Sequence, residues 1–303
     1  MSIEQNEHKI LDQEGISLKK FVRTDLAVEA KTLWEQSAGE TTQLPGVQAH
    51  EEDRDGFTVS TVRILDERGA QKLCKPIGDY VTVTLDALLQ RQADSFENAA
   101  QLLAVLLREQ LPLMPDASVL VVGLGNRAIT PDAVGPVTIE HVMVTRHLRR
   151  QMPQEFAAFR TVSAVASGVL GTTGIESAEL VQALVDDLHP DAVIAVDALA
   201  CADFDRLCRT IQLTNTGIVP GSGVGNDRAA LNRETLSVPV LALGVPTVVD
   251  AGTFVQDARA EGMFVTPRDI DAVVHDISKL AGYGINLALH NGLTIGDVDL
   301  FLS

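Results

Sequence analysis

Hydrophobic and polar positions follow two different periods along the chain. Residues 57–65 and 80–88 alternate between apolar and polar side chains and are rich in Val and Thr, which is typical of strands. In residues 94–111 the apolar side chains recur on one helical face, and Asp94 and Glu97 stand in capping-box spacing at its start. The pattern therefore predicts two strands followed by a helix.

Beyond residue 94 the pattern switches repeatedly between strand and helix. Short apolar runs predict buried strands at 118–125, 161–166, 191–200, 211–214 and 239–249. Helical patterns are predicted at 134–150, at 175–188 and in a last helix that begins at Thr266-Pro267 with Asp269 in capping position. Because strands alternating with helices build parallel sheets, we predict an α/β fold with a mainly parallel sheet and helices on both faces.

The N-terminal part has a different pattern. Residues 1–22 lack hydrophobic periodicity and look like a loose leader, and residues 23–36 have a helical pattern. Residues 38–56 are polar and turn-rich, and we interpret the acidic stretch 50–56 as a solvated loop. The two alternating strands that follow predict an N-terminal β-rich extension, either an antiparallel edge of the sheet or a small subdomain.

Composition and charge narrow the function classes. The chain has 303 residues, 46% of them hydrophobic, and a net charge of -17. Phosphate contacts need clustered Lys and Arg, so we expect no direct binding to nucleic acid or to an anionic membrane. The first 20 residues have no apolar core, and no apolar run reaches the roughly 20 residues needed to span a bilayer. Together with only three cysteines, this predicts a cytoplasmic protein.

The stretch GLGNRAITPDAVGP resembles a phosphate-binding turn at first sight. Gly123, Gly125 and Ala128 fit the spacing G-x-G-x-x-A after a strand. However, the next apolar strand ends in ASG and lacks the acidic residue that would bind a ribose, and two prolines interrupt the turn. The glycines therefore give only weak support for a nucleotide site.

Asp132 offers a second interpretation of the same stretch. It follows Pro131 in the opening turn of a predicted helix, and Asp197 ends a buried strand. The carboxyl ends of parallel strands form the functional crevice of such sheets, so the two acids can face each other there. Two close carboxylates share one proton, and such a pair suits water attack on an amide. Two purely structural acids remain the alternative from spacing alone.

Other groups have both a functional and a structural interpretation. The glycine-rich stretch 220–228 either presents main-chain N–H groups to a substrate or forms a tight connection, and its candidate residues are Gly221, Ser222, Gly223, Gly225 and Asn226. The seven histidines show no metal-ligand spacing, and we interpret His189, just before Pro190, as a surface or helix-end residue. Cys201 and Cys208 are seven residues apart, on one face of a helix, and we interpret them as buried inert thiols.

Several long sequence segments together resemble the germination protease family, the spore endopeptidases. These segments are FVRTDLAVEAK, GLGNRAITPDAVGP, SGVLGTTGIESAEL, AVIAVDALA and GIVPGSGVGNDRAALNRETLSVPVLALGVPTVVDA, in order along the chain. The resemblance implies an atypical aspartic endopeptidase with its two essential acids at Asp132 and Asp197 and no cofactor. It also implies a fold similar to that of the hydrogenase-maturation peptidases and a homotetramer. The expected substrates are the small acid-soluble spore proteins, whose degradation the enzyme would initiate in the germinating spore, so the expected location is the forespore or spore core.

The resemblance also implies a zymogen that removes its own leader. Substrates of the family are cut after an acidic residue in a context similar to Thr-Glu-(Phe/Ile)-Ala, and the segment Thr24–Ala27 reads TDLA. The expected cut lies between Asp25 and Leu26, which divides the chain into a propeptide, 1–25, and a peptidase domain, 26–303. Two alternatives remain. The likeness to the hydrogenase-maturation peptidases, which bind nickel through two acids and a histidine, implies that a nickel or zinc peptidase would hold its metal with Asp132, Asp197 and one histidine such as His189. The other alternative is a nucleotide-binding regulatory protein.

Overall fold

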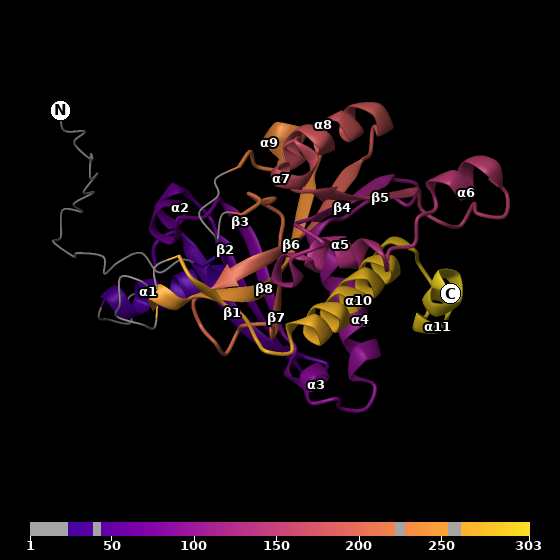
Figure 1. The fold of residues 1–303 in the computed structure, drawn as a ribbon. Helices are drawn as coiled ribbons and strands as arrows, with labels where there is room; N and C mark the ends of the chain where they lie inside the picture. The colour runs from indigo at the N-terminus through magenta and orange to yellow at the C-terminus, as the bar shows by residue number, and fades with distance from the viewer. Residues whose placement is uncertain (1–23, 39–43, 222–227, 254–261) are drawn as a thin grey trace, which may run out of the picture.

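A computed structural model describes residues 24–38, 44–221, 228–253 and 262–303 of the chain. Within them, nine strands form one sheet in the order β1-β2-β3-β7-β8-β6-β4-β5, with β9 paired to β8 (Figure 1). The strands are β1 (Val47–Arg54), β2 (Phe57–Ile64), β3 (Gly78–Thr84), β4 (Val119–Leu124), β5 (Val162–Gly168), β6 (Ala192–Cys201), β7 (Thr210–Thr214), β8 (Val240–Asp250) and β9 (Phe264–Val265).

Helices connect most of these strands. They are α1 (Ala27–Ala38), α2 (Glu67–Leu73), α3 (Asp86–Leu89), α4 (Ser95–Gln110), α5 (Val134–Ile139), α6 (Arg146–Gln151), α7 (Leu170–Thr173), α8 (Ser177–Leu188), α9 (Arg233–Leu236), α10 (Ile270–Leu289) and α11 (Ile295–Leu302). Two short 3-10 turns are η1 (Thr130–Asp132) and η3 (Ala251–Thr253). Of the described helices, even the 20-residue α10 is not long and apolar enough to cross a membrane.

The sheet has a parallel part and an antiparallel part. Strands β5, β4, β6 and β8 run parallel to their neighbours, whereas β1, β2, β3, β7 and β8 pair in antiparallel fashion. The predicted α/β fold with an N-terminal β-rich extension is confirmed. Of the two arrangements left open, the extension is an antiparallel edge that continues the main sheet.

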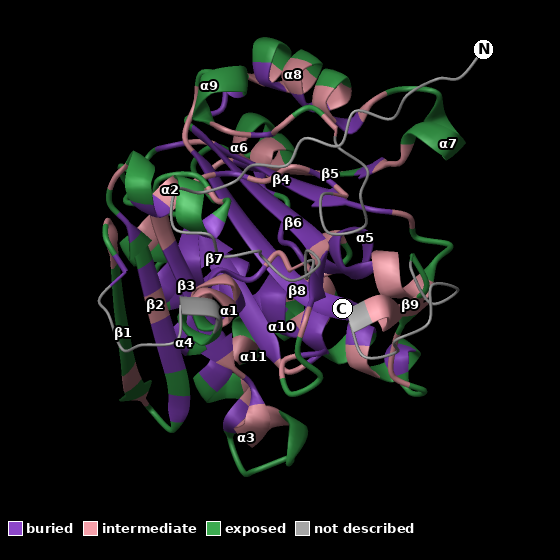
Figure 2. Cartoon of the chain, turned by 90° about the vertical axis from the view of Figure 1, so that its left-hand side faces the viewer, coloured by how far each residue is buried: buried purple, intermediate pink, exposed green. Residues whose placement is uncertain are grey.

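Helices cover both faces of the sheet, as the alternation in β4 illustrates. Val119 and Val121 pack in a core with residues of α4 and α10, while Leu120 and Val122 pack in a second core with residues of α8. Figure 2 shows the buried strands between α8 on one side and α10 on the other. Because both faces are covered, the central parallel strands are apolar at nearly every position and lack alternation.

The interpretation of residues 50–56 as a loop was wrong, because most of them belong to the edge strand β1. β1 pairs with β2 along its whole length, and Asp55 and Gly56 make the turn between them with φ values of 55° and 83°. An Asp-Gly pair with positive φ at both positions is the favoured two-residue hairpin turn. The strand is polar because it is an exposed edge, which leaves no hydrophobic alternation to recognise.

Three predicted helix features also differ. The predicted helix 134–150 consists of two separate helices, α5 and α6. Asp94 precedes α4 in the left-handed region, with φ 59°, and its side chain makes no capping hydrogen bond. The last long helix, α10, begins at Ile270, and the side chain of Asp269 does not cap it. In each case a local pattern was compatible with the helix, but the surrounding structure set the boundary.

Candidate active site

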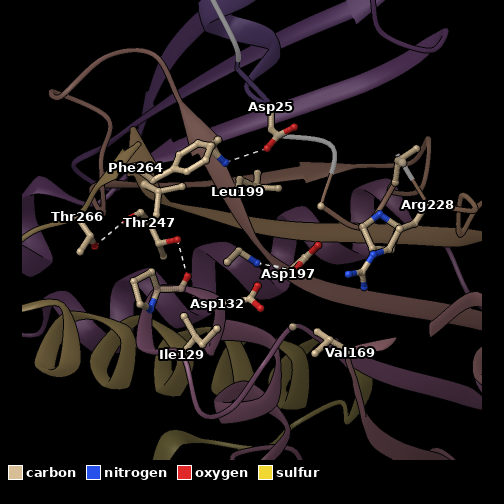
Figure 3. Close-up of a pocket in the computed structure, with 18 of the residues that line it drawn as sticks. Asp25, Ile129, Asp132, Val169, Asp197, Leu199, Arg228, Thr247, Phe264 and Thr266 are labelled. Carbon is tan, nitrogen blue, oxygen red and sulfur yellow. Dashed lines mark hydrogen bonds between the residues drawn. The ribbon is translucent and has the colours of Figure 1, made fainter. Parts of the chain in front are cut away.

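A pocket of about 380 Å³ lies at the carboxyl ends of the parallel strands β4, β6 and β8 (Figure 3). Its wall includes both predicted acids, Asp132 and Asp197, which approach it from different elements. The carboxyl ends of neighbouring parallel strands meet at one edge of the sheet, so the topology brings together Asp132, just after β4, and Asp197, which lies in β6 where its pairing with β4 stops. The proximity of the two acids, expected from the sequence, is therefore present in the structure.

Asp197 is the sixth residue of the buried strand β6, so the prediction that it ends its strand was wrong. Only 4% of the residue is exposed, and its Oδ1 accepts a hydrogen bond of 2.9 Å from the Ala198 N–H. Burial raises the pKa of Asp197 well above its ordinary value, and the neighbouring charge of Asp132 raises it further. The hydrogen bond from the Ala198 N–H lowers the pKa of Asp197, but by less than burial raises it. This carboxyl group therefore keeps its proton to unusually high pH.

Asp132 ends η1, the short turn that follows β4. Its side chain is half-buried, and its Oδ2 accepts a hydrogen bond of 2.8 Å from the Asn126 N–H. Burial raises the pKa of Asp132, while the Asn126 N–H and the positive charge of Arg228 lower it. Both acids have one main-chain donor and the charge of Arg228, so Asp132 is the more easily ionised member of the pair because it is less buried.

The glycines in and around the loop between β4 and α5 help to position Asp132. Gly125 has φ +109°, and a Cβ there would collide with the Asp132 carbonyl oxygen. Gly123 and Gly135 have no side chain where α5 lies directly against β4. The Asn126 N–H points to the loop's own carboxylate, so the loop does not present this donor to a phosphate. The structure thus gives the glycine spacing a different role from nucleotide binding.

Thr247, in β8, binds the loop that carries Asp132. It was not among the residues predicted from the sequence. In β8, Pro246 pairs with Leu199 and Val248 pairs with Ala200, so Thr247 is the extra residue of a β-bulge. Its hydroxyl group donates a hydrogen bond of 2.6 Å to the Pro131 carbonyl oxygen. Bulges often redirect side chains beside active sites. In the sequence, Pro246 inside a buried strand pattern was the signal that could have indicated this bulge.

Arg228 is the second pocket residue that the sequence analysis did not single out. It lines the pocket, and its positive charge lowers the pKa of both Asp132 and Asp197. Figure 3 shows its side chain beside the two acids. Gly221, from the glycine-rich stretch, also lines the pocket and has φ +74°. The other candidates in that stretch, Ser222, Gly223, Gly225 and Asn226, lie outside the described residues.

The hypothesis of a metal held by Asp132, Asp197 and His189 does not fit the geometry. His189 caps the C-terminus of α8 just before β6 begins, which confirms the helix-end role predicted for it, whereas Asp197 is the sixth residue of that strand. At about 3.3 Å per strand residue, His189 and Asp197 are too far apart to bind one ion. Within the described parts of the chain, no three His, Cys, Asp or Glu residues are grouped to hold a metal ion.

Cys201 and Cys208 are buried, as expected, but they do not share a helix. Cys201 is the last residue of β6, and Cys208 lies in a turn with φ 57°. Burial raises the pKa of the Cys208 thiol to about 12, and burial also raises the pKa of Cys201. Thiols in this state are not nucleophiles at neutral pH.

Comparison with known proteins identifies the family. The family model described as germination protease matches residues 27–260. The chain belongs to the germination protease family. It is 41% identical over 322 residues to the germination protease of Caldanaerobacter subterraneus subsp. tengcongensis, which covers 93% of this chain and 98% of the relative. The germination protease of Clostridium tetani is 40% identical over 324 residues, which covers 93% of this chain and 99% of the relative. Membership in this family makes the chain a peptidase.

Further relatives include a Bacillus cereus germination protease, 42% identical over 250 residues, which covers 81% of this chain and 68% of the relative. Among solved structures, a NiFe hydrogenase maturation protease HycI from Thermococcus kodakarensis KOD1 aligns with a TM-score of 0.33 and 16% identity. That alignment covers 56% of this chain and 92% of the other. The α/β fold of this germination protease family member is established by its own sheet topology.

Asp25, at the predicted propeptide cut, also lies in the wall of the pocket. Its N–H donates a hydrogen bond of 2.9 Å to the Ala200 carbonyl oxygen, and its Oδ2 accepts one of 2.8 Å from the Ala200 N–H. Leu26, on the other side of the predicted cut, is 0% exposed. The start of the described chain is thus attached to β6, three residues beyond Asp197.

Proposed function

We propose that this member of the germination protease family is an aspartic-type endopeptidase in which Asp132 and Asp197 activate water. The observation that carries the proposal is the pair of carboxyl groups in one pocket, each with a raised pKa but in unequal surroundings. A pair that shares one proton supplies a base and an acid at the same time. These are the two groups that amide hydrolysis by water requires.

Unequal burial suggests how the roles divide. Asp132, which is less buried and lies closer to ionisation, takes a proton from the attacking water, whose oxygen bonds to the carbonyl carbon. Asp197, which keeps its proton, donates it to the carbonyl oxygen. When the tetrahedral intermediate collapses, the C–N bond breaks, the proton held by Asp132 passes to the amine, and Asp197 recovers its own proton. The pair titrates as a unit, so its two apparent pKa values belong to both acids together.

The walls of the pocket suit a peptide. Ile129, Leu199 and Phe264 provide apolar surface, and Arg228 provides a positive charge. Pockets with apolar walls and a few polar groups orient a ligand through those polar groups. This combination fits a cut after an acidic residue followed by an apolar one, and we propose small acid-soluble spore proteins as substrates, degraded at the start of germination in the spore core.

We propose further that the chain is a zymogen with propeptide 1–25 and peptidase domain 26–303. The support is the segment Thr24–Ala27, whose sequence TDLA resembles the proposed substrate sequence. Asp25 also lines the same pocket as the two acids. Removal of residues 1–25 would take Asp25 away from Ala200 and open that part of the wall.

The proposed assembly is a homotetramer, with no direct binding to nucleic acid or membrane. The net charge of -17 supports the second part, because an acidic surface is repelled by phosphate groups. Light scattering of the purified chain tests the first part: a mass four times that of the 32.4 kDa chain is expected, and a monomer would contradict it.

The test is mass spectrometry of a small acid-soluble spore protein after incubation with the full chain or with a chain that begins at Leu26. We expect one cut after an acidic residue, which persists with a strong chelator and disappears in Asp132→Asn. The matched control is Asp187→Asn, at an exposed aspartate of α8. Loss of the cut with chelator and its return with added metal would favour a metallopeptidase, and no cut by either chain would overturn the proposal.

A further inference from the structure

Strand β6 has an open edge beside the two acids. Its last pair with β4 is Val196 with Gly123, whereas its pairing with β8 continues to Cys201. In the described parts of the chain, no strand pairs with the β4 side of β6 beyond Val196. The open edge of β6, defined here as Asp197–Cys201, therefore begins at one of the two acids.

The direction of the main-chain groups on this edge follows from the alternation of the strand. The Val193 N–H donates to the Pro239 carbonyl oxygen, on the β8 side. In a parallel pair, successive residues turn their N–H and C=O groups to opposite sides. Ala198 and Ala200 therefore direct theirs to the open edge, where the Ala198 N–H already donates to the Asp197 carboxylate. An edge of this kind is a template for pairing with another extended chain.

The chain already uses part of this edge for such a contact. Asp25 lies in a non-helical segment just before α1, and its N–H donates to the Ala200 carbonyl oxygen. The Ala200 N–H in turn donates to the Asp25 carboxylate. Both main-chain groups of Ala200 thus bind an incoming segment, and one of them binds an acidic side chain. The edge is accessible to a chain that arrives from outside the sheet.

The open edge also forms one wall of the pocket. Asp197, Leu199 and Ala200 line it from β6, and Asp132 and Ile129 line it from the loop after β4. Figure 3 shows Asp197 and Leu199 on the β6 side, with Asp132 and Ile129 below them and Asp25 beyond Leu199. A peptide that lies along this edge would pass between the loop and the strand, next to both carboxyl groups.

We infer that the substrate binds as an added strand on the open edge of β6, with its main chain hydrogen-bonded to the carbonyl oxygen of Ala198 and to the main-chain groups of Ala200. The inference rests on the proposed peptidase function and specifies the conformation in which the substrate is bound. Strand addition obtains affinity from main-chain hydrogen bonds and leaves side chains alternating between two walls. A substrate that uses the whole edge displaces Asp25 from Ala200.

A backbone ester scan tests this conformation without changing the protein. The probe is a synthetic peptide with the sequence of residues 20–31, KFVRTDLAVEAK, in which each amide except the one that is cut is replaced in turn by an ester. An ester has no N–H donor, so it removes one main-chain hydrogen bond. The protein is the form of the chain that cleaves the parent peptide, and kcat/KM is measured for each ester.

An added strand predicts an alternating profile. Esters at every second position near the cut should lower kcat/KM by roughly 3- to 10-fold, the loss expected for one hydrogen bond. Esters at the positions between them should change it by less than about 2-fold, because their N–H groups point away from β6. A flat profile, or a loss without alternation, would overturn the inference while cleavage of the parent peptide still supports the proposed function. If no form cleaves the parent peptide, the proposed function fails, and this inference fails with it.

Discussion

Two aspartates with identical side chains have different surroundings in one pocket. Asp197 lies within a buried strand, while Asp132 lies half-buried in a turn, and a main-chain N–H and Arg228 favour the ionised form of both. Both acids could be identified from the sequence, since each follows or ends an apolar run. The difference in burial between them could not be predicted, because it depends on elements that are distant in sequence.

The first prediction concerns the pH dependence of cleavage. Activity needs Asp132 ionised, so it should fall as the pH drops through the raised pKa of Asp132. It also needs a proton on Asp197, so it should fall again as the pH rises through the still higher pKa of that group. A plot of kcat/KM against pH should therefore be bell-shaped. A rate that is constant through the acidic range and falls only above neutral pH would argue against an ionised Asp132 as the base.

Arg228→Gln provides a second prediction at this scale. The positive charge lowers the pKa of Asp132, so its removal should raise that pKa and move the acidic limb of the profile to higher pH. Arg228→Lys should restore most of the shift, because it keeps the charge. An acidic limb that is the same in Arg228→Gln and in the unchanged chain would mean that the arginine does not act on the pair.

At the scale of elements, the site depends on the contact between η1 and β8. Thr247 is the extra residue of a bulge, and its hydroxyl group binds the carbonyl oxygen of Pro131, just before Asp132. The sequence pattern predicted β8 but not the bulge, because only the pairing with β6 reveals which residue is extra. Strand β1 was missed for a similar reason. An edge strand needs no apolar face, and only the pairing with β2 identifies it as a strand.

Thr247→Val is the prediction that belongs here. The change keeps the shape of the side chain and removes the hydrogen bond, so we expect a stability loss of about 1 kcal/mol and a several-fold fall in kcat. The matched control is Thr138→Val, because Thr138 is also buried and donates one hydrogen bond to a carbonyl oxygen, that of Val134, in α5. Both variants should lose similar stability in chemical denaturation, and only Thr247→Val should lose kcat. Equal kcat in the two variants would contradict a positioning role for Thr247.

For the whole molecule, the order of strands explains why the fold was largely predictable and the site only in part. Alternating strand and helix patterns after residue 94 were sufficient to predict a covered parallel sheet, and with it the place where Asp132 and Asp197 meet. The contact of Asp25 with Ala200 joins two segments far apart in sequence, so the pattern of apolar and polar residues could not predict it. The segment TDLA marked the position through its resemblance to a substrate, not through its structure.

The prediction at this scale is self-processing of the full chain. Intact mass and N-terminal sequencing should give a product that begins at Leu26, because the residue before the cut is acidic and lies beside the pair. Asp25→Lys should abolish this product, since it places a positive charge there. Asp187→Asn, at an exposed residue, serves as the control and should process normally. A product that begins elsewhere would contradict the proposed boundary between propeptide and peptidase domain.

The most direct test of the central claim compares kcat/KM on a small acid-soluble spore protein for Asp132→Asn, Asp197→Asn and the double variant. Groups that act as one unit give non-additive losses. We predict that each single variant stays folded and loses at least about 1,000-fold, and that the double variant is no worse than either. A single variant that keeps activity within tenfold of the unchanged chain would contradict a water-activating pair at Asp132 and Asp197.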